Sequence, residues 1–279
     1  MEQAFAHCAA LVREADKDRY LATLFVPEGT RSHVFALYAF NAEVAAIRER
    51  TREPFAAEVR LQWWRDVVSG TAAGDSERNP VAAALVETIK RRHLPHEPLL
   101  SLIEARRFDA YNEPMRSRAA LQEYVRATSS ALFEVAGRLI EEGSAGLPAD
   151  AAGQAYGITG LLRALPIHAS RGQIFLPADV LVQTGAEPAD IISGKDTPAL
   201  RAALAEMRRS ATNKLKEAET GLSTVSNGVK AAFLPLALVR GYLERMERSD
   251  YEPFRTPVDL PQWRRQWTIW RAARGAPYA

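Results

Sequence analysis

Blocks of apolar and charged residues, rich in Ala, Leu, Glu and Arg, fill most of the chain, and Gly and Pro separate them. Ala, Leu, Glu and Arg are strong helix formers, whereas Gly and Pro interrupt helices. This alternation predicts about ten helices. They cover residues 2–16, 31–51, 54–70, 79–93, 96–109, 118–140, 150–168, 198–220, 227–247 and 260–274.

Strand signals are almost absent from the chain. One short β-like run, GQIFLP at residues 172–177, ends at Pro177, which has no N–H to donate to a sheet. No linker is long or polar enough to separate independent domains, and no repeat of fixed period occurs. The sequence therefore predicts a single all-α domain over residues 1–279.

Composition narrows the class of protein. The chain has 279 residues, 47% of them hydrophobic and 25% charged, which is typical of a globular protein. A net charge of only +2 gives no reason to expect a nucleic-acid partner. Cys8 is the only cysteine, so a reducing compartment fits. The N-terminal residues lack the features of a signal peptide, and no apolar run is long enough to cross a bilayer. We therefore expect a cytoplasmic protein, with contact at the inner membrane face left open.

The segment ALYAFNAEVAAIRER, residues 36–50, has the frame of a metal-binding helix without its carboxylates. Asn41, Ala45 and Glu49 share one face, and Ala46 lies beside them. A carboxylate pair at this spacing can hold Mg²⁺, but here only Glu49 has a carboxylate. The alternative, that the alanines let a neighbouring helix approach closely, is the more common use of small residues.

A second informative segment runs from residue 155 to 181. Gly160, Ala164 and His168 share a helix face, with Arg163 beside Ala164. Pro166 predicts a kink or an early end of the helix, because it lacks an N–H and clashes with the preceding turn. Imidazole is a poor ligand for Mg²⁺, so His168 is expected to have a structural role. We therefore predict no metal site.

Two arginines of this segment can bind an anion. Arg163 and Arg171 carry guanidinium groups, which hold a phosphate through two parallel hydrogen bonds. Salt bridges on the surface or between helices are the alternative role for both. The sequence has no nucleophile elbow, zinc-protease motif or phosphate-binding glycine loop to suggest another chemistry.

The predicted helix at 260–274 is rich in tryptophan and arginine. Trp263, Trp267 and Trp270 form one stripe along it. The arginines lie mostly off that stripe and are Arg264, Arg265, Arg271 and Arg274. Three interpretations are possible: a helix that packs its Trp face on the core, an interfacial helix on anionic lipid, and a ligand for a partner's groove. We expect residues 260–274 to bind an anionic membrane or a membrane-bound partner, through a surface formed by Trp263, Arg264, Arg265, Trp267, Trp270 and Arg271.

Two long segments resemble the squalene/phytoene synthase superfamily. RYLATLFVPEGTRSHVFALYAFNAEV is similar to its first helical hairpin, and LLRALPIHASRGQIFLPADVL to its second metal-binding helix and the hinge that follows. The resemblance implies the isoprenoid synthase fold, a helical bundle around a central apolar cavity. Active members hold Mg²⁺ and two prenyl diphosphates with two aspartate-rich motifs and couple the substrates head to head. By position, those motifs fall on Ala45, Ala46, Glu49, Ala164 and His168.

A closer resemblance accounts for the missing carboxylates. LYAFNAEVA, LRALPIHASR, FLPADV and LPQWRRQWTIWR are similar to a subfamily that includes a mitochondrial respiratory complex I assembly factor. This resemblance implies a non-catalytic protein whose partners are respiratory complex subunits or other assembly factors. Two alternatives remain: an active prenyltransferase that uses Mg²⁺, and a non-catalytic module that binds an isoprenoid.

The resemblance also implies where a ligand would bind. The helices at 31–51 and 150–168 are expected to face each other across the central cavity. Glu49 and Arg163 would then be the polar groups left at the degenerate motif positions. The ligand-binding candidates are Asn41, Glu49, Arg163 and Arg171.

Overall fold

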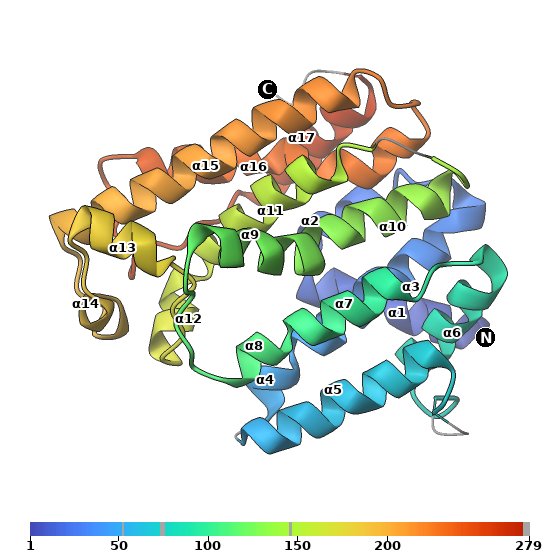
Figure 1. Cartoon of the computed structure of the whole chain (residues 1–279). Helices are drawn as coiled ribbons and strands as arrows, with labels where there is room; N and C mark the ends of the chain where they lie inside the picture. Colours follow the sequence, from blue (N-terminus) through green and yellow to red (C-terminus); the bar gives the residue numbers. More distant parts are fainter. Residues whose placement is uncertain (52, 73–75, 145–146, 276–279) are drawn as a thin grey trace. The chain divides into compact units, whose positions relative to one another are not determined.

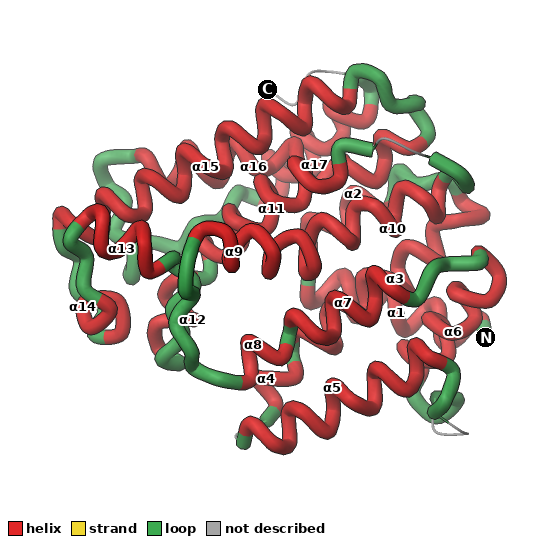
Figure 2. The backbone as a smooth tube through the Cα atoms, in the orientation of Figure 1, coloured by secondary structure: helices red, strands yellow, loops and turns green. Residues whose placement is uncertain are grey.

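The computed structural model describes residues 1–51, 53–72, 76–144 and 147–275, and within these ranges every regular element is a helix (Figure 2). The all-α prediction is therefore confirmed. The residues group into two compact units, each assembled from three separate stretches of chain. That the whole chain forms one domain stays a prediction.

Unit 1 comprises Met1–Tyr111, Ala131–Leu147 and Thr224–Pro235. Its helices are α1 (Glu2–Ala15), α2 (Lys17–Thr23), α3 (Glu28–Ala45), α4 (Ile47–Arg50), α5 (Pro54–Ser69), α6 (Pro80–Arg92), α7 (Glu97–Ala105), α8 (Arg107–Ala110) and α10 (Ala131–Ile140). Helix α3 is the centre of this unit, because α1, α6 and α10 all pack on it. Its residues from His33 to Asn41 are buried without interruption, so α3 has no solvent face over two turns.

Unit 2 comprises Asn112–Ser130, Pro148–Ser223 and Leu236–Ala279. It contains α9 (Arg118–Val125), the π-helical turn η1 (Arg126–Ser130), α11 (Ala149–Arg163), α12 (Leu165–Ser170), α13 (Ala178–Thr184), α14 (Pro188–Ile192), α15 (Pro198–Leu222), α16 (Val239–Glu247) and α17 (Gln262–Ala273). The 3₁₀ helix η2 (Val229–Leu238) leads into α16. Helix α11 packs along α15 and against η1, and Figure 1 shows it beside the long α15.

The long amphipathic helices lie where the sequence predicts them. Helices α1, α5, α6, α15 and α17 match their predicted ranges within about two residues at each end. The prediction missed three short helices, α2, α13 and α14, of seven, seven and five residues. Segments this short carry too few turns to display a helical period.

Both segments with motif-like frames break where a single helix was predicted. Helix α3 gives way to α4 at Ala46, and α11 gives way to α12 at Ala164. Pro166 explains the second break, since it lies in the first turn of α12, where its missing N–H costs nothing. The predicted interruption by Pro166 is therefore confirmed.

The β-like run at 172–177 forms no strand in the part of the chain that the structure describes. Met115 N donates to Ile174 O over 3.1 Å, and Ala178 N donates to Met115 O over 2.9 Å. The run thus pairs with one residue, and Pro177 cannot extend the ladder. Gly172 begins the run with φ = +71°, a left-handed backbone that favours glycine.

We predict opposite effects for two glycines of α11. A Cβ added at Gly153 would lie 2.2 Å from Ser130 Cα, whereas one at Gly160 meets nothing within 4 Å. Gly153→Ala should lower stability by about 1–3 kcal/mol through overpacking against rigid backbone. Gly160→Ala should raise it by up to about 1 kcal/mol through helix propensity. Thermal denaturation of both variants measures this, and a Gly153→Ala protein as stable as the parent would contradict it.

We predict that Cys8 is unreactive in the folded protein. The side chain is completely buried, and burial raises the pKa of its thiol to about 12. Because the thiolate is the nucleophile, a disulfide reagent at neutral pH should label almost no folded protein. The same reagent in denaturant should find one thiol per chain. Rapid labelling without denaturant would show that α1 opens readily.

Candidate functional site

The first motif frame lies on α3 and α4 of unit 1. Ala45 and Ala46 are half-buried, and Glu49 is exposed on α4. Asn41 is only 8% exposed, and its buried Oδ1 accepts no hydrogen bond from any described residue. A buried oxygen that accepts no hydrogen bond costs free energy. Asn41 is therefore the polar group of this helix face best suited to accept a hydrogen bond from a ligand.

Sequence reasoning missed a buried charged group near Asn41. Arg19, on α2, stacks its guanidinium 5.1 Å from the ring centre of Tyr38, one helical turn before Asn41. Its Nη1 also lies 3.4 Å from Asp16 Oδ2, and Asp18 is buried beside it in the chain. Burial raises the pKa of Tyr38 to about 12, with Arg19 opposing the shift. The only signal in the sequence is the charged run DKDR, a composition that is typical of solvent-exposed segments.

The second motif frame lies on α11 and α12 of unit 2, where Arg163 already has protein partners. Its guanidinium carbon lies 3.7 Å from the centre of the Tyr242 ring, and its Nε donates to Val258 O over 3.1 Å. Its Nη2 is 3.9 Å from Asp259 Oδ1. Arg163 therefore connects α11 to α16 and to the chain that leads into α17. A phosphate would compete with these contacts.

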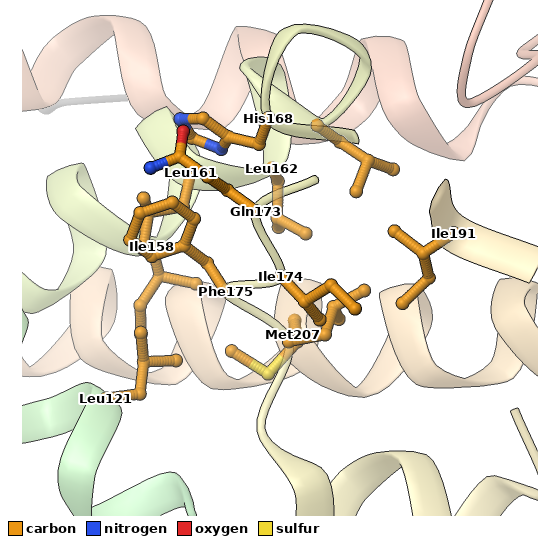
Figure 3. A pocket seen from close by; sticks show the side chains of 12 residues that line it. Leu121, Ile158, Leu161, Leu162, His168, Gln173, Ile174, Phe175, Ile191 and Met207 are labelled. Carbon is orange, nitrogen blue, oxygen red and sulfur yellow. The ribbon is translucent and has the colours of Figure 1, made fainter. Parts of the chain in front are cut away.

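His168 lies at an apolar pocket within unit 2. The pocket is narrow: its cavity volume is about 20 Å³, within a wider, partly open hollow of about 380 Å³. Figure 3 shows the His168 and Gln173 side chains together at one end, with Met207 and Ile191 away from them. The His168 ring packs on Phe175 with centres 4.5 Å apart, and Gln173 N donates to His168 O over 2.9 Å. This pocket is suited to an apolar group with one polar end.

Arg171 closes α12. It is half-buried, and its backbone N–H donates to His168 O over 3.0 Å. Arg171 is followed by Gly172 and then by residues 173–176, which line the pocket. Arg171 therefore directly precedes the pocket-lining segment in the chain. Ligand binding by Arg171 stays a prediction, as does ligand binding by Asn41, Glu49 and Arg163.

The residues present do not fit a magnesium cluster. Of the five positions onto which the sequence resemblance places the aspartate-rich motifs, only Glu49 has a carboxylate, and it is exposed. In the part of the chain that the structure describes, no three His, Cys, Asp or Glu side chains are grouped to hold a metal ion. Helix α4 belongs to unit 1 and Arg163 to unit 2. That the two frames face each other across a cavity therefore stays a prediction.

The Trp stripe of α17 does not pack on the core, so that interpretation is wrong. Trp263, Trp267 and Trp270 are 69%, 53% and 38% exposed. Helix α17 instead buries Arg265 and Ile269, which lie one turn apart. The core-packing interpretation assumes that the apolar stripe faces inward, but in α17 an arginine lies on the buried face. Among the described residues, no helix is both long and apolar enough to cross a bilayer.

Comparison with known proteins decides the family. The family model for squalene/phytoene synthase matches residues 12–271. The chain belongs to this family. Among solved structures, a dehydrosqualene synthase in complex with a ligand has a TM-score of 0.85 at 19% identity, covering 98% of this chain and 96% of that one. Squalene synthase HpnC from Alicyclobacillus acidocaldarius has a TM-score of 0.76 at 24% identity, covering 90% and 96%. The isoprenoid synthase fold is therefore confirmed.

The curated relatives separate into two groups. Complex I assembly factor 6 of Rattus norvegicus is 32% identical over 89% of this chain and 75% of its own length. Its homologue from Drosophila melanogaster is 32% identical over 88% and 76%. The 15-cis-phytoene synthase of Synechococcus elongatus is 25% identical over 95% and 91%. The chain is thus more similar to these assembly factors than to this synthase.

We predict that Arg163→Ala loosens the C-terminal arm of unit 2, residues 256–275. The change removes a cation–π contact and a hydrogen bond to Val258 O, together about 1–2 kcal/mol. Amide hydrogen exchange in the arm should then be roughly tenfold faster. Arg116→Ala is the matched control, because Arg116 is exposed and forms an ion pair with nearby Glu113. Equal exchange in both variants would remove Arg163 from this role.

Proposed function

We propose that this chain assists the assembly of a respiratory membrane complex of the complex I type, without catalysing prenyl transfer. The observation that carries the proposal is the similarity to complex I assembly factor 6, which is 32% identical over 89% of this chain. A shared fold alone would not distinguish an assembly factor from a synthase.

The chemistry of the motif positions supports a non-catalytic role. Departure of a diphosphate needs several positive charges, which Mg²⁺ ions supply in active enzymes of this type. Ala45, Ala46 and Ala164 offer no ligand atom, and His168 offers an imidazole, which is unsuited to Mg²⁺. Arg163 is occupied by Tyr242 and Val258. We therefore propose that the protein needs no metal cofactor.

The proposed partners are respiratory complex subunits or other assembly factors, met at the inner face of the membrane from the cytoplasmic side. A second candidate function, non-catalytic binding of an isoprenoid, is favoured by the unit 2 pocket. Its Leu, Ile and Phe lining suits a branched apolar chain, and His168 with Gln173 suits a polar end.

Two measurements on the intact chain test the proposal. In a host that lacks its own copy, the chain should restore assembled complex I on native gels and NADH oxidation by membranes. The purified chain should yield no prenyl product from farnesyl or geranylgeranyl diphosphate with Mg²⁺, under conditions where the Synechococcus phytoene synthase is active.

Product formation would favour the prenyltransferase alternative and overturn the non-catalytic proposal. Failure to restore complex I would overturn the assembly role. Calorimetric binding of farnesyl diphosphate without turnover, lost in Leu165→Arg but retained in Val182→Arg, would support the isoprenoid-binding candidate. Leu165 lines the pocket, whereas Val182 is exposed and lies outside its lining.

A further inference from the structure

Helix α17 holds three tryptophans outward because its opposite side is fixed to unit 2. At 3.6 residues per turn, Trp263, Trp267 and Trp270 lie on the side opposite Arg265 and Ile269. Arg265 is 4% exposed and Ile269 is completely buried. The exposure of the three Trp side chains is therefore a consequence of how the helix is attached.

The attachment rests on polar contacts that are specific for Arg265. Its Nη2 pairs with Asp259 and lies 3.4 Å from the Tyr242 hydroxyl, while its Nη1 donates to Gln262 over 3.0 Å. Arg163 stacks on the same Tyr242 ring. Through Tyr242, Arg265 thus connects α17 to α16 and fixes which side of α17 faces inward.

The exposed aromatic surface is partly ordered before any partner binds. The rings of Trp267 and Trp270 stack with centres 5.0 Å apart and planes 18° apart. The Arg274 guanidinium lies 4.3 Å from the centre of the Trp270 ring. Exposed tryptophan is costly to leave in water, and here three side chains gather on one 12-residue helix.

The charge of this helix has one sign. Residues 262–274 contain four arginines and no acidic residue. Arg265 is used internally, and Arg264 lies 3.8 Å from Glu244. Arg271 and Arg274 form no ion pair with any described residue, so their charge remains available to an external anion.

We propose that the Trp face of α17, formed by Trp263, Trp267, Trp270, Arg271 and Arg274, docks the protein on an anionic lipid surface. Tryptophan rings favour the headgroup depth of a bilayer, and arginines beside them neutralise lipid phosphates. The proposal rests on the proposed function, because an assembly factor for a membrane complex must meet its subunits at the bilayer.

A lipid surface fits this face better than a protein groove does. Helix α17 is attached through one side, so its aromatic side forms a convex surface. A bilayer interface adapts to a convex surface, whereas a protein partner needs a matching groove. The helix has 12 residues, or about 18 Å at 1.5 Å per residue, which is too short to span the membrane. It would therefore lie in the plane of the interface.

Vesicle binding of the intact chain tests the proposal. The protein should sediment with vesicles of phosphatidylcholine plus phosphatidylglycerol and ignore vesicles of phosphatidylcholine alone. Added salt should release it, since surface charges are screened within about 8 Å at physiological ionic strength. Its Trp emission should shift to shorter wavelength on binding. Equal binding to both vesicle types, or to neither, would overturn the proposal.

Variants locate the surface. Replacing Trp263, Trp267 and Trp270 together with Gln should weaken binding by at least about tenfold, because these side chains supply the buried apolar area. Arg271→Gln with Arg274→Gln should weaken it roughly 30-fold at low salt, about fivefold per arginine. The matched controls Val182→Gln and Arg116→Gln change exposed residues of unit 2 outside α17 and should leave binding unchanged.

All of these variants should keep the thermal midpoint of the parent, because each altered side chain projects into solvent. If the tryptophan variant binds anionic vesicles as the parent does, the proposal is wrong. Complementation separates the membrane-docking proposal from the proposed function. If the parent chain restores complex I without binding vesicles, only the membrane-docking proposal is overturned. A parent chain that binds vesicles without restoring complex I overturns the assembly role alone.

Discussion

The close approach of α11 to its neighbours is the constraint on which unit 2 depends. Gly153 faces the backbone of Ser130 at a distance that leaves no room for a Cβ, and a Cβ at Gly157 would lie 2.6 Å from Val125 Cγ1. Small residues on this side let the π-helical turn and the end of α9 press directly on α11. The π turn, an insertion in an otherwise α-helical segment, places Ser129 and Ser130 against these glycines.

That close packing leaves only the C-terminal end of α11 for other contacts, because the middle of the helix is buried. At this end Arg163 contacts Tyr242. Helix α12 begins there, with Pro166 in its first turn, and leads to the pocket. Isoprenoid synthases of the active type would place metal ligands in this same turn. Here an alanine stands at the break, and an imidazole one turn later packs on Phe175. The turn between α11 and α12 thus carries Ala164 and His168 at the positions onto which the sequence resemblance places the second motif.

The sequence predicted most of the fold because its long helices are strongly patterned and its hinge, Gly172 to Pro177, is recognisable. It could not predict the partners of Arg163, since Val258 and Asp259 lie 95 and 96 residues away and only tertiary packing brings them together. Nor did it indicate Arg19, because arginines are mostly exposed and nothing in the sequence marks one in the first turn of a seven-residue helix as buried. The local sequence pattern indicates where helices form, whereas these contacts depend on how the helices are arranged in the fold.

Helix α17 shows how a charged side chain can occupy the buried face of a helix while its apolar side chains are exposed. A buried arginine is expensive unless it is paired and hydrogen-bonded, and Arg265 meets that condition through Asp259, Gln262 and Tyr242. Once these partners fix Arg265 inside, helical geometry forces the tryptophans outward, whatever their hydrophobicity. The same Tyr242 ring receives Arg163 from α11. Arg163, at the end of α11, and Arg265, which orients α17, therefore share one aromatic support. Arg163 thus has a structural task of its own, which is to support the ring that holds α17 and its exposed aromatic face in position.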